Sequence, residues 1–154
     1  MAKYELVATG GTFDIIHKGH TELLEKAFSI SSNVIIGLTS DELAEKKGKK
    51  ITNNYSVRLE TLTSLIQKNF PNSMFRISKL DNDFGPAVLE GNVQALVVSE
   101  ETSYQGEILN KLRTEKNLPK VEIIIVPMVL AEDGKRISTS RIKKSEIDYK
   151  GNAS

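Results

Sequence analysis

The stretch YELVATGGTFDIIHKGHTELLEKAFSI, from Tyr4 to Ile30, combines a short apolar run, a glycine turn and an amphipathic segment. Tyr4–Thr9 is rich in apolar residues, and we predict a buried strand that stops at Gly10 and Gly11. After the turn, apolar residues recur at helical spacing, which predicts a helix that begins near Lys18. A strand followed at once by a helix is typical of the parallel β-α-β unit. This stretch therefore predicts an α/β fold.

The rest of the chain repeats this alternation. Its predicted strands read as continuous runs of Val, Ile and Leu, which is typical of parallel strands buried on both faces. We therefore expect one domain over residues 1–154, a Rossmann-like five-stranded parallel sheet with helices on both faces, and a frayed tail from about residue 149. The further strands are predicted at Asn33–Thr39, Ser73–Ser78, Gln94–Ser99 and Val121–Pro127, and the further helices at Ser40–Lys47, Tyr55–Phe70 and Tyr104–Asn117.

Composition excludes several classes of function. The net charge of +1 argues against a broad electrostatic hold on nucleic acid or on a membrane surface. The chain has no cysteine, which excludes disulfides, thiolate catalysis and cysteine-ligated zinc. The N-terminus does not resemble a signal peptide, and the longest apolar run, Ile123–Ala131, is too short to span a membrane. We expect a cytoplasmic protein without nucleic-acid or membrane partners, and the oligomeric state stays open.

The turn after the first predicted strand has the composition of a phosphate-binding site. Gly10 and Gly11 let the backbone pass close to a ligand, and Thr12 adds a hydroxyl group. The helix that follows offers unpaired N–H groups and the positive end of its dipole. The glycine spacing differs from that of the dinucleotide motif, and no Gly-Lys-Ser/Thr follows as in a P-loop.

The two histidines of the chain, His17 and His20, lie in the same turn. They are three residues apart, so in a helical first turn both rings project to one side. Two donors beside Thr12 could stabilise charge that develops on a phosphorus atom. A pair at this spacing also occurs by chance, and a metal site with Asp14 as third ligand is a weaker alternative. The surrounding glycines, hydroxyl and helix start favour the phosphate site.

A second phosphate-binding segment is predicted near the other end of the chain, at Arg136–Lys144. Its Ser/Thr run at 138–140 predicts a helix N-terminus with free N–H groups. Together with the cations Arg141 and Lys143, such a terminus suits a diphosphate or triphosphate. The alternative is an ordinary helix cap beside a solvated basic face.

These two motifs resemble the paired signatures of the nucleotidyltransferase superfamily with the H-x-G-H motif. The resemblance implies that His17 and His20 contact nucleotide phosphates and stabilise the pentacoordinate transition state, and that Thr12 positions the reacting phosphate. The second signature departs at its last cation, where Lys143 replaces arginine and a bidentate contact is lost. The nucleotide-binding residues implied are Gly10, Gly11, Thr12, Phe13, His20, Ser138, Thr139, Ser140, Arg141 and Lys143.

The middle of the chain resembles the archaeal and eukaryotic type of phosphopantetheine adenylyltransferase. The similarity covers Gly37–Lys47, Asp81–Val88 and Ser99–Arg113, and it extends from about Tyr4 to Asp148. It implies transfer of AMP from ATP to 4′-phosphopantetheine with Mg²⁺, by direct in-line displacement. The protein itself is expected to hold no resident metal.

The resemblance also implies an acceptor site. A lysine after the second strand reaches the reacting phosphates, and of Lys46 and Lys47 we favour Lys47. Thr12, Asp81 and Phe84 complete the predicted acceptor contacts, although Phe84 stands where the family has tyrosine. Three alternatives stay open: another member of the superfamily, such as a glycerol-3-phosphate cytidylyltransferase or an FMN adenylyltransferase, an inactive nucleotide-binding regulator, and a structural metal-binding domain.

Overall fold

The computed structural model describes residues 4–82 and 92–127. Within these ranges five parallel strands form one sheet, in the order β3-β2-β1-β4-β5. The strands are β1 (Val7–Gly11), β2 (Asn33–Thr39), β3 (Met74–Leu80), β4 (Ala95–Ser99) and β5 (Glu122–Val126), and the helices are α1 (Lys18–Ile30), α2 (Asp41–Lys46), α3 (Tyr55–Asn69), the 3₁₀ turn η1 (Glu100–Thr102) and α5 (Tyr104–Glu115). The α/β fold predicted from the sequence is confirmed.

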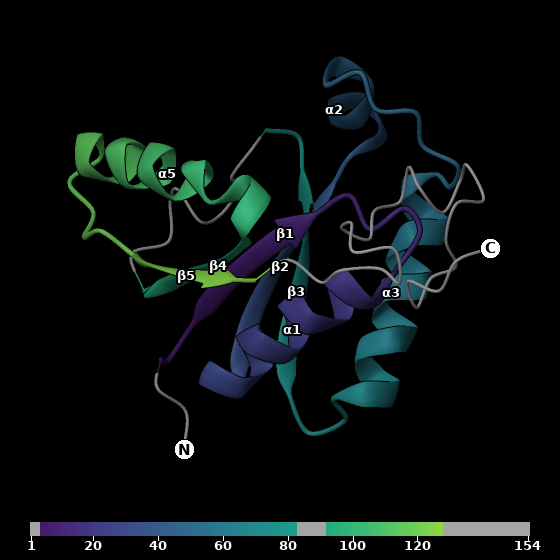
Figure 1. Ribbon diagram of the computed structural model, residues 1–154, viewed down its shortest axis with the longest axis horizontal. Helices are drawn as coiled ribbons and strands as arrows, with labels where there is room; N and C mark the ends of the chain where they lie inside the picture. Colours follow the sequence, from purple (N-terminus) through teal and green to yellow (C-terminus); the bar gives the residue numbers. More distant parts are fainter. Residues whose placement is uncertain (1–3, 83–91, 128–154) are drawn as a thin grey trace.

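Helices cover both faces of the sheet, with α1 and α3 on one side and α5 on the other (Figure 1). Ile36 of β2 lies in the core with Leu24 of α1 and Leu62 of α3, and all three side chains have no exposed surface. The adjacent Ile35 belongs to the opposite core, with Leu109 of α5. Because burial of one such side chain contributes about 1.5–3 kcal/mol, these two layers hold the strand ends in place.

The first strand differs from the prediction at both ends. It begins at Val7 and continues through Gly10 and Gly11, so the expectation that the glycines stop it is wrong. Gly10 pairs with Gly37 of β2, and a Cβ atom at Gly10 would lie 3.0 Å from the carbonyl oxygen of Gly37. Gly10 thus extends the strand, because its lack of a Cβ atom allows the backbone of Gly37 to approach closely. Tyr4 lies outside the strand and forms an isolated bridge with Ser31.

The helices begin and end close to the predicted residues. The helix α1 begins at Lys18, and α3 ends at Asn69, before Pro71. Ser40 caps α2, with its hydroxyl accepting from the amide of Leu43 at 3.0 Å. Of the described helices, none combines the length and the apolar character that a membrane crossing requires.

The candidate site lies at the carboxyl edge of the sheet. The strand order reverses between β1 and β4, and in parallel sheets ligands bind beyond the strand ends at such a reversal. The loops that leave this edge contact one another: the amide of Ser40 donates to the carbonyl of Leu80 at 2.8 Å, and the Thr39 hydroxyl donates to the carbonyl of Gly11 at 3.2 Å. This edge therefore collects the segments after β1, β2 and β3.

Candidate active site

Phe13 shapes the turn that follows β1. Its φ angle of 50° lies in the left-handed region, which bulky residues rarely adopt. Its ring is 1% exposed and lies against Gly11, where a Cβ atom would be 3.2 Å from the ring. The same ring contacts His20, with 4.9 Å between the ring centroids. The turn therefore connects the end of β1 directly to the first turn of α1.

The two histidines cap α1 for each other. His17 is the N-cap residue, and its Nδ1 accepts from the amide of Gly19 at 3.1 Å. In return, Nδ1 of His20 accepts from the amide of His17 at 3.2 Å. This is the reciprocal arrangement of a capping box, with imidazoles in place of the usual Ser/Thr and Glu/Gln. The cap fixes both rings, which stack with centroids 4.0 Å apart.

The cap also determines where each imidazole carries its proton. Because both Nδ1 atoms accept hydrogen bonds, the neutral rings are protonated at Nε2. Burial lowers the pKa of His17 to about 4. Burial and the nearby His17 and Lys49 lower the pKa of His20 to about 3. At neutral pH the pair therefore offers two N–H donors and no positive charge.

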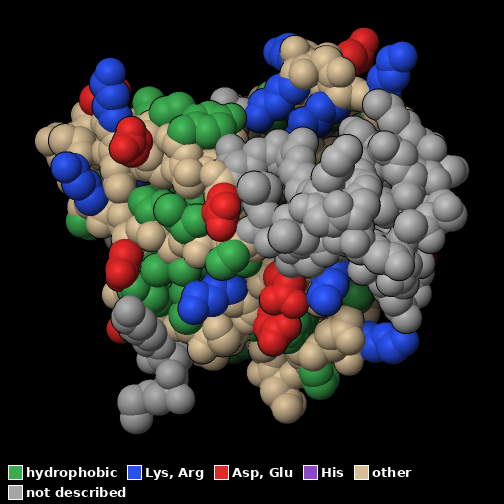
Figure 2. All heavy atoms as spheres, in the orientation of Figure 1, with side chains coloured by type: hydrophobic (Ala, Val, Ile, Leu, Met, Phe, Trp, Pro, Cys, Tyr) green, Lys and Arg blue, Asp and Glu red, His purple; other side chains and the backbone are tan. Residues whose placement is uncertain are grey.

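The positive charge beside Thr12 comes from Lys49. Its ammonium group donates to the Thr12 hydroxyl at 3.0 Å. Lys47 is the C-cap residue of α2, whereas the hydrogen bond to the Thr12 hydroxyl comes from Lys49. Figure 2 shows Lys and Arg side chains gathered over α2 and the segment after it. The sequence favours Lys46 and Lys47 instead, because four lysines within residues 46–50 give no basis for choosing Lys49.

The β1–α1 turn thus brings together a glycine-lined strand end, two neutral imidazoles and the Thr12 hydroxyl with its Lys49 partner. Residues 8–145 match the family described as cytidylyltransferase-like. The chain belongs to the cytidylyltransferase-like family. The resemblance stated from the sequence is thereby confirmed.

Several relatives of this cytidylyltransferase-like chain have the same name. The phosphopantetheine adenylyltransferase of Methanosarcina barkeri is 43% identical over 148 residues, which cover 94% of this chain and 90% of the relative. The protein of the same name from Pyrococcus abyssi is 41% identical over 156 residues, which cover 99% of this chain and 97% of the relative. A solved structure from Archaeoglobus fulgidus, titled as a protein with unknown function, has a TM-score of 0.72 and 29% identity, and the match covers 78% of this chain and 87% of that one.

The lowered pKa values of the histidine pair predict how this cytidylyltransferase-like protein responds to acid. An unfolded histidine binds a proton near its ordinary pKa of 6.5, whereas folded His17 and His20 remain neutral to about 4 and 3. Their contribution to stability is therefore complete above pH 6.5 and decreases as the pH falls toward those values. NMR titration of the two rings should give midpoints well below 6.5. Midpoints at the ordinary value would contradict the buried, capped arrangement.

Gly19 is required by the ring of His17. A Cβ atom at Gly19 would lie 2.8 Å from Cε1 and 3.0 Å from Nδ1 of that ring. We expect Gly19→Ala to displace the ring and lower turnover about 10-fold or more, because misplaced donors lose transition-state contact. Alanine is the better helix former, so the melting temperature should change little. The exposed neighbour Lys18→Ala is the control, and equal turnover in both variants would contradict this role of Gly19.

Asp14 holds the backbone of the segment after α2. Its carboxylate accepts from the amides of Thr52 at 2.8 Å and Asn53 at 2.9 Å. Both oxygens are therefore engaged, which weakens the alternative of a metal bound by Asp14 with the histidine pair. Across residues 4–82 and 92–127, no group of three or more His, Cys, Asp or Glu is placed to hold a metal ion.

The predicted site residues that the structure describes, apart from Lys47, lie in two places. Asp81 is exposed and follows β3 at the carboxyl edge of the sheet, on the same side as Thr12. Gly10, Gly11, Thr12, Phe13 and both histidines lie together around the β1–α1 turn. Outside the described residues are the predictions for Phe84, Ser138, Thr139, Ser140, Arg141, Lys143 and the tail from about residue 149.

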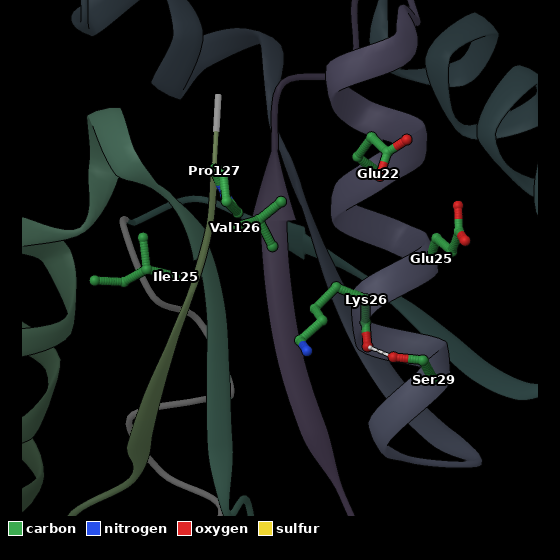
Figure 3. Close-up of a pocket in the computed structure, with 7 residues that line it drawn as sticks. All are labelled: Glu22, Glu25, Lys26, Ser29, Ile125, Val126 and Pro127. Atoms are coloured by element: carbon green, nitrogen blue, oxygen red, sulfur yellow. Dashed lines mark hydrogen bonds between the residues drawn. The ribbon is translucent and has the colours of Figure 1, made fainter. Parts of the chain in front are cut away.

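A separate hollow of about 270 Å³ lies between α1 and the end of β5 (Figure 3). The hollow is lined from α1 by Glu22, Glu25, Lys26 and Ser29, and from the end of β5 and the residue after it by Ile125, Val126 and Pro127. It contains none of the candidate site residues, and its two carboxylates oppose the binding of phosphate groups. This hollow is therefore a poorer candidate for phosphate binding than the β1–α1 turn.

Proposed function

We propose that this chain transfers the adenylyl group of ATP to 4′-phosphopantetheine, releasing pyrophosphate and forming dephospho-coenzyme A. The observation that supports the proposal most strongly is the combination, in one turn, of two Nε2–H imidazole donors and the Lys49 ammonium group on Thr12. Hydrogen-bond donors and a cation suit phosphoryl and nucleotidyl transfer, which require positioning and charge stabilisation rather than a protein nucleophile.

In the proposed reaction, a phosphate oxygen of 4′-phosphopantetheine attacks the α-phosphorus of ATP. A new P–O bond forms as the bond between the α-phosphorus and the α,β-bridging oxygen breaks, and pyrophosphate leaves with that electron pair. Because the attacking phosphate is already anionic, no protein base needs to remove a proton. The neutral rings of His17 and His20 donate to the oxygens on which charge increases, and Lys49 neutralises part of that charge. Magnesium arrives with ATP as part of the substrate.

The acceptor is proposed from the relatives. Proteins named phosphopantetheine adenylyltransferase are 41–43% identical to this chain over 94% or more of its length. We extend the proposal to the residues that the sequence predicts for each substrate: the Ser/Thr run at 138–140 with Arg141 and Lys143 for the triphosphate, and Asp81 and Phe84 for the acceptor. Lys47 stays a candidate for acceptor binding beside Lys49.

The proposal is tested with a panel of substrates. The purified protein is incubated with Mg²⁺ and either ATP or CTP, in combination with 4′-phosphopantetheine, glycerol 3-phosphate or FMN, and pyrophosphate release is measured. We expect release with ATP and 4′-phosphopantetheine. Release with another pair would keep the nucleotidyltransferase reaction and replace the substrates. Absence of release in every combination would favour a nucleotide-binding regulator instead.

A further inference from the structure

Arg58 of α3 is a buried cation that contacts four separate segments around the candidate site. Its side chain has no exposed surface. Nη1 donates to the carbonyls of Thr12 at 2.8 Å and Thr39 at 2.7 Å, at the ends of β1 and β2. Nε donates to the carbonyl of Asn53 at 3.0 Å, and Nη2 to the carboxylate of Asp41 at 2.7 Å. Four of the five guanidinium protons are thereby accounted for.

Asp14 links the β1–α1 turn to the segment after α2 by a second set of hydrogen bonds. Its carboxylate accepts from the amides of Thr52 and Asn53, and its own carbonyl accepts from Nδ2 of Asn53 at 3.0 Å. Residues 52–53 are therefore held by Asp14 through their amides and by Arg58 through the Asn53 carbonyl. The segment after α2 and the β1–α1 turn are linked by two independent sets of hydrogen bonds.

These bonds flank the uncommon turn at Phe13. Arg58 binds the carbonyl of Thr12 on one side of Phe13, and Asn53 binds the carbonyl of Asp14 on the other. A non-glycine residue at φ 50° persists only where its surroundings fix it. The Phe13 ring in turn contacts His20. The hydrogen bonds of Arg58 therefore support two donors of the site. They support His20 through the turn at Phe13, and Lys49 through the segment that carries it.

We propose that Arg58 is a positioning residue for nucleotidyl transfer, which holds Thr12 and the Lys49 segment in register without touching substrate. This inference rests on the proposed function. Its guanidinium points to backbone carbonyls and to Asp41, so its charge is already partnered within the protein. Desolvation raises the pKa of Asp41. The hydrogen bond from Arg58, the hydrogen bond from the Tyr55 amide and the positive charge of Arg58 outweigh this effect, so the pKa is lowered overall.

Lysine cannot replace this geometry. A guanidinium presents donors in a rigid plane and reaches several acceptors at once, whereas an ammonium group is a compact point charge on a flexible stem. Arg58→Lys therefore keeps the charge and most of the volume but cannot bridge Thr12, Thr39, Asp41 and Asn53 together. The variant separates the bridging role of Arg58 from its charge.

Arg113 of α5 supplies a matched control. Like Arg58 it is fully buried in a helix and donates to loop carbonyls, to Pro119 at 2.8 Å and Val93 at 3.5 Å. These contacts lie before β4 and β5, at the amino edge of the sheet and away from the candidate site. Arg113→Lys should therefore weaken the fold in a comparable way without disturbing Thr12 or Lys49.

The kinetic test compares the two lysine variants below their melting temperatures, with the reaction of the wild-type protein as reference. Arg58→Lys should lower kcat about 10- to 100-fold, because small displacements of reacting groups are costly in rate. The KM for ATP should change less than about 3-fold, since the groups that bind ATP are retained. Arg113→Lys should keep kcat within about 2-fold. Equal kcat values for the two variants would overturn the proposal.

A second readout does not depend on activity. The amides of Thr52 and Asn53 should exchange with solvent more rapidly in Arg58→Lys than in the wild type, and at the wild-type rate in Arg113→Lys. Unchanged exchange in Arg58→Lys would also overturn the proposal. If the wild-type protein forms no product, the proposed function fails, and this exchange measurement still decides whether Arg58 holds the segment.

Discussion

Replacement of His20 by alanine should lower turnover about 100- to 1,000-fold while the protein remains folded. His20 is neutral and protonated at Nε2, because its Nδ1 accepts from the His17 amide and burial lowers its pKa to about 3. In the proposed reaction its contribution is a hydrogen bond that strengthens as charge develops on the transferring phosphate. Loss of such a bond affects kcat more than KM, and steady-state kinetics with varied ATP would separate the two.

The alanine variant also removes half of the capping box, so a control must separate the cap from the donor. Glutamine at the third helical position accepts from the N-cap amide in ordinary capping boxes, and His20→Gln should therefore retain the stability of α1. We expect its melting temperature to be close to that of the wild type and its turnover to remain low. Near-normal turnover in both variants would show that His20 serves only the helix.

Replacement of Lys49 by alanine has the second large expected effect, a loss of about 100-fold or more in kcat/KM. With both imidazoles neutral, Lys49 is the charged group that the described structure places on Thr12, at 3.0 Å. In the proposed reaction its removal leaves the charge that develops on the phosphate without this compensation. Lys49→Arg retains the charge and should recover part of the activity, because arginine also binds phosphate.

Lys47 and Lys50 distinguish a specific contact from the general basic character of the segment. Both are exposed lysines within two residues of Lys49. Lys50→Ala should change kcat/KM less than about 3-fold, which is the size expected for a screened surface charge. Lys47→Ala tests the lysine that the sequence favours. A larger loss in Lys47→Ala than in Lys49→Ala would contradict the assignment of Lys49.

Sequence reasoning predicts much of this fold because its signals are local. Continuous apolar runs predict parallel strands, and the sheet confirms them. The predicted burial holds for β2 and β4, whereas the edge strands β3 and β5 are partly exposed. The helix start at Lys18 is confirmed for the same reason. The spacing of His17 and His20 predicts rings on one side of the helix, and the stacked pair confirms it. The strand end at Gly10 was wrong because the decisive contact, with Gly37, lies on another strand.

The features that the sequence analysis missed depend on contacts between distant segments. Nothing local distinguishes Lys49 from the lysines around it, since only the folded loop brings it to Thr12. Arg58 did carry a signal, because it stands at the four-residue spacing of the buried residues Leu62 and Ile66. A charged residue on the buried stripe of a helix predicts a buried and fully bonded cation. The histidine cap has a signal too, since its spacing is that of a capping box.

The central claim is tested most directly by the mass of the organic product. The purified protein is incubated with ATP, Mg²⁺ and 4′-phosphopantetheine, and the products are identified by mass spectrometry while pyrophosphate is measured in the same samples. The account predicts a product with the mass of dephospho-coenzyme A and one pyrophosphate for each molecule formed. Consumption of ATP without that product, or unchanged substrates after long incubation, would contradict it.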